Sequence, residues 1–182
     1  SARCANGSAS AGFTHKWICL PAASVRSTQC VTADWRNASA KARSVAAYVK
    51  LLLRDHERVL LAGWHREVYA IWREALAKFD PVLYTGSETT AGKDRSVEAF
   101  TKGKSRVMFI SLRSGIGLDG LQHNCNQVAF GELDWSPQVH HQIIGRVRRP
   151  GQRLQVDAHY LHDDSRIKKL AEHVLAHGVA GV

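Results

Sequence analysis

The sequence predicts an α/β fold in which a mainly parallel sheet is covered by helices on both faces, and three observations support this prediction. Short apolar runs typical of strands buried on both faces recur along the chain, for example at residues 58–63 and 106–111. The segments between such runs repeat apolar residues with the period of a helix. Strands and helices alternate, which indicates βαβ units and therefore parallel strands.

The first half of the chain begins this alternation. A helix is expected from about residue 39, with Asn37 or Ser39 as its cap. A strand over residues 58–63 follows, then the clearest amphipathic helix in the chain, and then a strand over residues 81–84. The apolar positions of the amphipathic helix are Val68, Ile71, Trp72, Ala75, Leu76 and Phe79.

The second half continues the same pattern. The predicted elements are, in chain order, a helix over residues 93–102, strands over 106–111 and 127–131, a helix over 139–147 and a strand over 155–161. A last helix is expected to begin at Asp163 or Asp164. Its apolar side chains again repeat with helical spacing, and Gly178 stands just past its end.

Residues 1–36 differ from the rest of the chain in composition. They are rich in Ala, Ser, Gly and Thr, and no period persists in them. We expect a poorly ordered leader, linker or remnant of a preceding domain there, and a folded domain over residues 37–182. The chain begins with Ser1, and its only methionine is Met108. We therefore expect a processed or excised piece of a longer protein.

The composition limits the kinds of partner and site. A net charge of +9 favours a polyanionic partner, nucleic acid first. No apolar run approaches the roughly 18 residues that span a bilayer, and the N-terminus lacks the apolar core of a signal peptide. No CxxC pair is present, so we expect free thiols and no metal site. The four cysteines are Cys4, Cys19, Cys30 and Cys125.

The first candidate for a phosphate-binding P-loop is the tripeptide Gly103-Lys104-Ser105. A P-loop requires a glycine five positions earlier, where this chain has Glu98, and it leads from a strand into a helix. The tripeptide instead leads from a predicted helix into a strand, so we interpret it as a helix end and a turn. The chain also lacks an Asp-Glu pair after a strand to hold Mg²⁺. We do not expect it to bind and hydrolyse a nucleotide alone.

In folds of this kind, ligands bind beyond the carboxyl ends of the strands. The predicted loops at these ends are residues 63–66, 85–90, 111–122 and 132–138. Residues 111–122 are dense in glycine and hydroxyl groups, and glycines let backbone N–H groups approach phosphate closely. Gly115, Gly117 and Gly120 match the spacing of a dinucleotide-binding loop. They follow the third strand, however, and no acidic residue ends the next strand to bind a ribose, which disfavours a Rossmann-type cofactor domain.

The segment over residues 138–152 concentrates positive charge at the end of a predicted helix. Arg146, Arg148 and Arg149 fall within four positions, and Pro150 and Gly151 end the helix. Arginine is the side chain that best matches phosphate in a fixed geometry, because its planar guanidinium donates two parallel hydrogen bonds. The alternative is a solvated basic helix end.

These segments together resemble superfamily 2 helicases of the Swi/Snf-like type, in the bacterial and phage branch of DEAD/DEAH-box proteins. The frame Gln142-x-x-Gly145-Arg146-x-x-Arg149-x-Gly151-Gln152 is similar to motif VI of that family. Residues 111–122 are similar to motif V, usually written S-T-R-A-G-G-x-G-x-N. Asp119 stands here in the place of the asparagine, and the segment before it is one residue shorter.

Three further segments extend the resemblance over about residues 40–175. Asp134-Trp135-Ser136-Pro137 is similar to the D-W-N-P that precedes motif VI, with Ser136 and Pro137 also suited to a helix start. Residues 59–67 resemble motif IV, and residues 84–87 resemble the glycine turn that follows it. The resemblance implies a RecA-like three-layer sandwich, and specifically the C-terminal RecA-like lobe of a DNA-dependent ATPase.

The resemblance also implies two sets of site residues on this lobe, one for ATP and one for the DNA backbone. Arg149 is expected to be the arginine finger on the γ-phosphate, with Arg146 bridging to phosphate or to the other lobe. The other residues expected at ATP are Gln142, Gly145, Gly117 and Asp119, the last on a ribose hydroxyl. The residues expected on the DNA backbone are Ser111 or Ser114, Arg113, Gly86, Ser87, His65 and Arg66, although His65 could equally pack or cap the next helix. Arg148 has no role in the family.

The implied DNA-dependent ATPase needs a second RecA-like lobe. ATP and Mg²⁺ are expected on the P-loop and carboxylates of an N-terminal RecA-like lobe of the same protein, so this piece alone should be inactive. Its partners would be that lobe and DNA, in the cytoplasm of a bacterium or from a phage. The alternative is a stand-alone, non-catalytic, basic nucleic-acid-binding module derived from such a lobe. Helicase, duplex translocase and remodeller remain open, as do polarity, biological process and oligomeric state.

Overall fold

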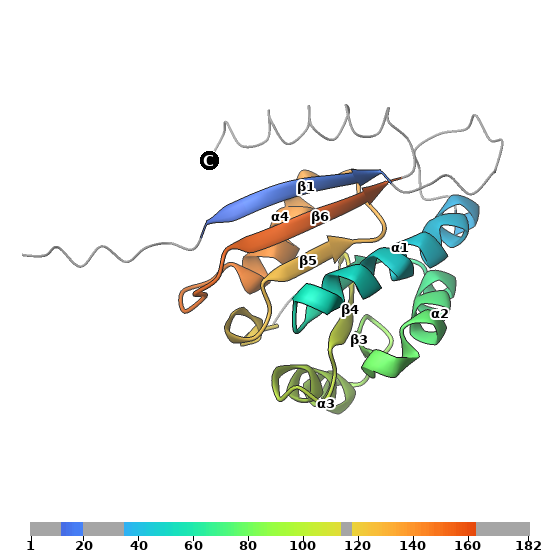
Figure 1. Cartoon of the computed structure of the whole chain (residues 1–182). Helices are drawn as coiled ribbons and strands as arrows, with labels where there is room; N and C mark the ends of the chain where they lie inside the picture. Colours follow the sequence, from blue (N-terminus) through green and yellow to red (C-terminus); the bar gives the residue numbers. More distant parts are fainter. Residues whose placement is uncertain (1–11, 20–34, 114–117, 163–182) are drawn as a thin grey trace, which may run out of the picture.

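The protein folds around one parallel β-sheet. In the computed structural model, which describes residues 12–19, 35–113 and 118–162, six strands lie in the order β1-β6-β5-β2-β4-β3 (Figure 1). All neighbouring pairs are parallel. The strands are β1 Phe13–Cys19, β2 Val59–Gly63, β3 Val82–Tyr84, β4 Val107–Ser111, β5 Gln127–Phe130 and β6 Val156–His162.

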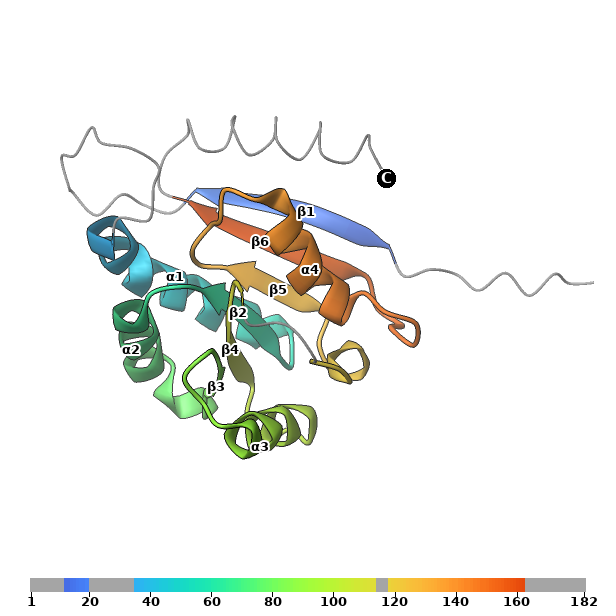
Figure 2. The same cartoon turned by 180° about the vertical axis from the view of Figure 1, so that it is seen from behind.

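Helices cover both faces of this sheet, which confirms the predicted α/β sandwich. Helices α1 and α2 lie on one face, and α3 and α4 lie on the other (Figures 1 and 2). The helices are α1 Trp35–Asp55, α2 Arg66–Ala75, α3 Thr90–Thr101 and α4 Pro137–Val147, with short 3₁₀ helices at η1 Ala77–Phe79 and η2 Leu121–His123.

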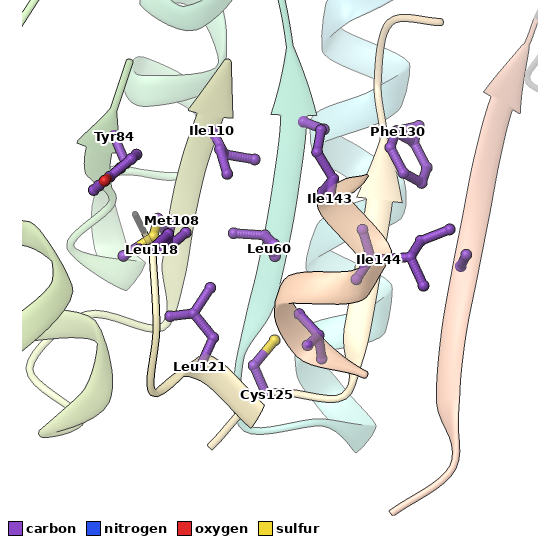
Figure 3. Close-up of a cluster of buried hydrophobic side chains, with 14 of the residues drawn as sticks. Leu60, Tyr84, Met108, Ile110, Leu118, Leu121, Cys125, Phe130, Ile143 and Ile144 are labelled. Carbon is purple, nitrogen blue, oxygen red and sulfur yellow. The ribbon is translucent and has the colours of Figure 1, made fainter. Parts of the chain in front are cut away.

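Alternate residues of the central strands supply two separate cores. Leu61 and Phe109 are fully buried and pack with α1 and α2. Leu60, one position earlier, faces the opposite layer and packs in the second core. In Figure 3, Ile143 and Ile144 of α4 lie among the side chains of that second core. Because strand residues alternate between faces, each apolar strand can fill both cores at once.

Helix α4 begins where the sequence predicts, but the expected side-chain cap does not stabilise its start. Ser136 occupies the N-cap position and Pro137 starts the helix, but the Ser136 side chain makes no capping hydrogen bond. Its backbone N–H instead donates to the Asp134 carboxylate at 2.9 Å. His140 on this helix is buried against the rings of Phe130 and Tyr160, with ring centroids 4.8 and 5.7 Å away.

Strand β1 lies within residues 1–36, where the sequence shows no persistent period. It pairs with β6 along its whole length. Polar contacts stabilise it, because the Lys16 ammonium lies 2.8 Å from the Asp157 carboxylate and the Thr14 hydroxyl donates to the same group. The strand FTHKWIC has neither a strict alternation of apolar and polar residues nor an unbroken apolar run, so its pattern is not that of a typical strand. Residues 1–11 and 20–34 lie outside the described residues.

Two of the predicted boundaries also shift. Helix α1 already begins at Trp35, so neither Asn37 nor Ser39 precedes it. The amphipathic helix ends at Ala75, and the predicted position Phe79 falls in η1. Asp80 then takes a left-handed conformation with φ of 50° ahead of the next strand. The last predicted helix, from Asp163 or Asp164, lies outside the described residues.

The Gly103-Lys104-Ser105 tripeptide is a turn, as predicted. Helix α3 ends at Thr101, and Gly103 has a φ of +82°, a left-handed conformation that glycine adopts most readily. The chain then enters β4. The tripeptide therefore lies at the amino end of a strand, whereas a P-loop follows the carboxyl end of one.

Two glycines provide a matched test of packing. A Cβ at Gly131 would stand 2.4 Å from the buried Trp72 ring, whereas a Cβ on Gly145 in α4 would meet no atom within 4 Å. Gly131→Ala should therefore lower the free energy of unfolding by about 1–3 kcal/mol. Gly145→Ala should raise it by about 0.5–1 kcal/mol, because alanine is the better helix former. Urea unfolding of both variants checks this, and a stable Gly131→Ala would contradict the packing.

His140 should make stability depend on pH. Burial lowers its pKa from 6.5 to about 4. Since the folded-state pKa lies below the unfolded one, the unfolded chain takes up the proton first as the pH falls. Stability from His140 is complete above its unfolded pKa and is lost progressively toward its folded one. At roughly 1.4 kcal/mol per pKa unit, the loss between about pH 7 and about pH 5 is about 2 kcal/mol.

His140→Gln keeps a hydrogen-bond acceptor but cannot titrate, so it should remove about 2 kcal/mol of this pH dependence in urea unfolding. Leu154→Ala, which replaces an exposed apolar side chain, is the control and should retain the wild-type slope. Equal slopes in wild type and His140→Gln would show that His140 is not the titrating group.

Candidate functional site

The four loops selected from the sequence meet at one edge of the sheet. β5, β2, β4 and β3 are consecutive neighbours and all run in the same direction. The segments that follow their carboxyl ends therefore lie side by side, which is where ligands bind in open parallel sheets. Every predicted site residue within the described part of the chain comes from these segments or from α4 and its end.

A buried carboxylate joins two of these loops. Glu132 follows β5 and is 6% exposed. One of its oxygens accepts the backbone N–H groups of Trp64 at 2.6 Å and His65 at 3.0 Å, just after β2. The other oxygen lies 2.5 Å from Nδ1 of His65. We call these contacts the Glu132 clasp. They fix the carboxyl ends of β2 and β5 relative to each other.

The clasp changes the role expected for His65. Its ring is turned toward Glu132, and it occupies the position just before α2 without capping that helix through its side chain. The structure therefore gives His65 a contact within the protein, which was the packing alternative weighed from the sequence. Arg66 begins α2 and is exposed, so it stays available for a ligand.

Arg113, after β4, stands over the loop that follows β2. Its guanidinium carbon lies 4.9 Å from the centroid of the Trp64 ring. Its Nη2 lies 3.5 Å from the Asp134 carboxylate, which follows β5. The Arg113 side chain nevertheless remains 66% exposed. Three neighbouring strands thus hold one exposed guanidinium at this edge.

Asp134 also contacts the helix that carries the other arginines. Its backbone N–H donates to Nε2 of His140 on α4 at 3.1 Å, and its carboxylate accepts the N–H of Ser136 at 2.9 Å. The loop between β5 and α4 is therefore tied both to the helix and to Arg113.

The hydroxyl-bearing residues differ in accessibility. Ser111 ends β4 and is only 8% exposed. Gly86 and Ser87 are exposed in the turn after β3, where the Ser87 hydroxyl lies 3.0 Å from that of Thr85. Ser114 and Gly117 lie outside the described residues. Gly86 and Ser87 are thus accessible, whereas Ser111 is mostly covered in this structure.

Arg149 lies just beyond α4 and pairs with a residue of the loop after β4. Its Nη1 lies 2.6 Å from an oxygen of Asp119, and its Nε donates to the carbonyl of Gly145 at 3.2 Å. The N–H of Gly120 and the Arg149 guanidinium both donate to Asp119, and they lower the pKa of this carboxyl. The structure therefore brings the predicted finger together with the predicted ribose ligand.

The remaining motif VI residues sit around the same helix end. Arg146 and Gly145 are half-buried in the last turn of α4, and Gln142 is exposed one turn earlier. Gln152 closes the segment, because its side-chain amide donates to the carbonyl of Cys125 at 2.9 Å. Arg148 is exposed, and its guanidinium carbon stands 5.6 Å from the ring centre of Phe13.

Sequence reasoning missed the residues that position the site. Glu132, Asp134 and Trp64 fall within the predicted loops, but none of them was predicted to be a site residue. The sequence did hold a signal for Glu132 and Asp134, because an acidic residue that follows a buried parallel strand faces the loops of the neighbouring strands. What could not be foreseen was which backbone N–H groups Glu132 would accept.

Two other kinds of feature are absent from the described residues. Within residues 12–19, 35–113 and 118–162, no group of three or more His, Cys, Asp or Glu side chains could hold a metal ion. No helix in these same ranges is long and apolar enough to cross a membrane.

Comparisons with known proteins agree with this architecture. Residues 43–151 match the family described as the helicase conserved C-terminal domain. The chain is 30% identical over 132 residues to the Drosophila melanogaster SWI/SNF-related matrix-associated actin-dependent regulator of chromatin subfamily A-like protein 1. It is 32% identical over 130 residues to the Bos taurus protein of the same name. These matches cover 69% of this chain but only 17% and 14% of the relatives.

Solved structures show the same fold. The C-terminal domain of the DEAD-box protein Dbp5 superposes with a TM-score of 0.66 at 14% identity, over 92% of this chain and 85% of that one. The C-terminal part of the Fun30 ATPase domain gives a TM-score of 0.62 at 21% identity, over 71% of this chain and 44% of that one. The family match spans more than half of the chain. This chain belongs to the helicase conserved C-terminal domain family of superfamily 2 helicases, with SWI/SNF-related relatives.

Proposed function

We propose that this chain is the C-terminal lobe of an ATP-dependent DNA helicase or translocase, and that it supplies arginine fingers to ATP bound on an N-terminal lobe of the same protein. ATP and Mg²⁺ would be held mainly by that lobe. The observation that carries the proposal is the placement of Arg149. Two contacts fix its guanidinium at the C-terminal end of α4, one to Asp119 in the segment after β4 and one to its own helix.

The contact with Asp119 suits a residue that must change partners. Asp119 is largely exposed, so solvent screens its ion pair with Arg149 and the pair is weak. The γ-phosphate carries more charge and accepts bidentate hydrogen bonds, so Arg149 can leave Asp119 at little cost. In the transition state the guanidinium would stabilise charge on the phosphoryl oxygens. Asp119 would then be free to accept a ribose hydroxyl, while Arg146, Gln142, Gly145 and Gly117 line the nucleotide.

DNA would lie along the loops after β2, β3 and β4. Arg113 and Arg66 are exposed there and can reach phosphates, and Gly86 and Ser87 offer accessible backbone and hydroxyl groups. Ser111 or Ser114 would add a hydroxyl, and His65 would act through the Glu132 clasp. Such contacts give affinity without sequence preference. The bacterial or phage origin and cytoplasmic location expected from the motifs remain predictions, because the relatives compared above are animal proteins.

The sharpest test of the finger is Arg149→Ala in the full-length enzyme. DNA-stimulated ATP hydrolysis should fall by roughly 10³–10⁵-fold, because the transition state loses its cation. Binding of a fluorescent ATP analogue should persist, since the other lobe holds most of the nucleotide. Steady-state phosphate release and equilibrium nucleotide binding measure the two effects separately.

Arg148→Ala provides the matched control one position earlier. Arg148 is exposed and faces the Phe13 ring, so this variant should retain hydrolysis near the wild-type rate. Equal losses in the two variants would point to damage at the helix end. Retained turnover in Arg149→Ala would overturn the finger assignment.

A further inference from the structure

We infer that Trp64 and Arg113 form a stacking surface for an unpaired base of the bound nucleic-acid strand. The inference rests on the proposed function only in taking DNA as the ligand. It adds contact with a base to a surface otherwise assigned to the phosphate backbone. We call these two side chains the Trp64–Arg113 platform.

The first observation is that an exposed ring is held in a fixed place. Trp64 is 42% exposed. Its backbone N–H is fixed by the buried Glu132 carboxylate at 2.6 Å, directly after a fully buried strand. A large aromatic side chain held rigidly at the surface offers contact area at a low cost in conformational entropy. The backbone that carries the ring is therefore fixed, and the exposed ring can stack on a flat partner.

The second observation is the guanidinium next to the ring. The Arg113 guanidinium carbon lies 4.9 Å from the centroid of Trp64, and Asp134 holds the same group from another side at 3.5 Å. Despite both contacts, the Arg113 side chain is 66% exposed. A planar guanidinium stacks on aromatic faces and on bases, and it also binds phosphate. Aromatic rings beside arginines are the combination that binds single strands.

The charges around the ring favour a nucleic acid over an apolar protein surface. Glu132 and Asp134 face inward, with side chains only 7% and 13% exposed. In the loop after β2, the start of α2 and the loop after β4, the exposed charges are Arg66, Glu67, Arg113 and Asp119, and Asp119 is paired with Arg149. A base in this position would keep its own phosphate next to Arg66 and Arg113, so stacking and charge neutralisation would act together.

The platform predicts a preference among nucleic acids. Bases in a duplex are already stacked on each other, so a base can reach Trp64 only where the strand is unpaired. Every base has a π face, so the preference would be for single strands rather than for a sequence. Phosphate contacts alone would not distinguish a strand with bases from one without them.

The test compares a thymidine oligonucleotide of about 12 nucleotides with an abasic strand of equal length, each bound to the full 182-residue chain. Fluorescence anisotropy at several salt concentrations gives the Kd and the salt dependence. Wild type should bind the thymidine strand at least about fivefold more tightly than the abasic strand. Trp64→Ala should lose this difference, with the abasic affinity and the salt dependence unchanged. Trp64→Phe should retain most of it.

Two controls separate stacking from charge and from folding. Arg113→Ala should weaken both strands and reduce the salt slope by about one phosphate contact. Leu154→Ala removes an apolar side chain that is 60% exposed at the amino end of β6, the opposite edge of the sheet, and should change neither affinity. Circular dichroism and thermal unfolding should show Trp64→Ala folded, since the ring fills no core.

Equal affinity of wild type for both strands would overturn the platform while leaving the phosphate contacts standing. A Trp64→Ala variant with the full wild-type preference for thymidine would overturn it as well. If wild type bound neither strand, the DNA contact of the proposed function would fail together with the platform. The Arg149 experiment would stay informative in every case, because it measures hydrolysis.

Discussion

The carboxyl edge of this sheet depends on one buried carboxylate. A carboxylate removed from water is costly unless hydrogen bonds satisfy it, and Glu132 accepts two backbone N–H groups and faces an imidazole nitrogen. These donors all come from the segment after β2, so the contact joins two strands where the chain leaves the sheet. Beneath it, a Cβ on Gly63 would stand 2.7 Å from the Trp72 ring, which leaves room only for glycine.

The segment after Glu132 connects the loop proposed to bind DNA with the helix proposed to lie near ATP. Asp134 reaches Arg113 on the proposed DNA side and, through His140, contacts the helix that leads to Arg146 and Arg149. The guanidinium expected at DNA and the helix expected at ATP are therefore held by the same short loop. A displacement of α4 when the two lobes close would reach Arg113 through the hydrogen bond between Asp134 and His140 and the ion pair between Asp134 and Arg113. Under the proposed function, this is a route by which nucleotide binding and DNA binding would influence each other.

Much of the fold was predictable, because the central strands are apolar on both faces and the helices are amphipathic. Strand β1 was not, because its stability comes from pairing with β6 and from polar contacts to Asp157 that are distant in sequence. The loops of the site were predictable from the direction of the strands. Their internal contacts were not, since the pairing of Arg149 with Asp119 and the stacking of Arg113 on Trp64 each join separate loops.

The central claim is that the arginines of α4 act on a nucleotide held by another polypeptide lobe. The most direct measurement is phosphate release from ATP by the pure 182-residue chain with DNA present, before and after the N-terminal lobe is added as a separate polypeptide. We predict no release above the uncatalysed background from the chain alone, and hydrolysis once the second lobe is present. Hydrolysis by the chain alone would contradict the account.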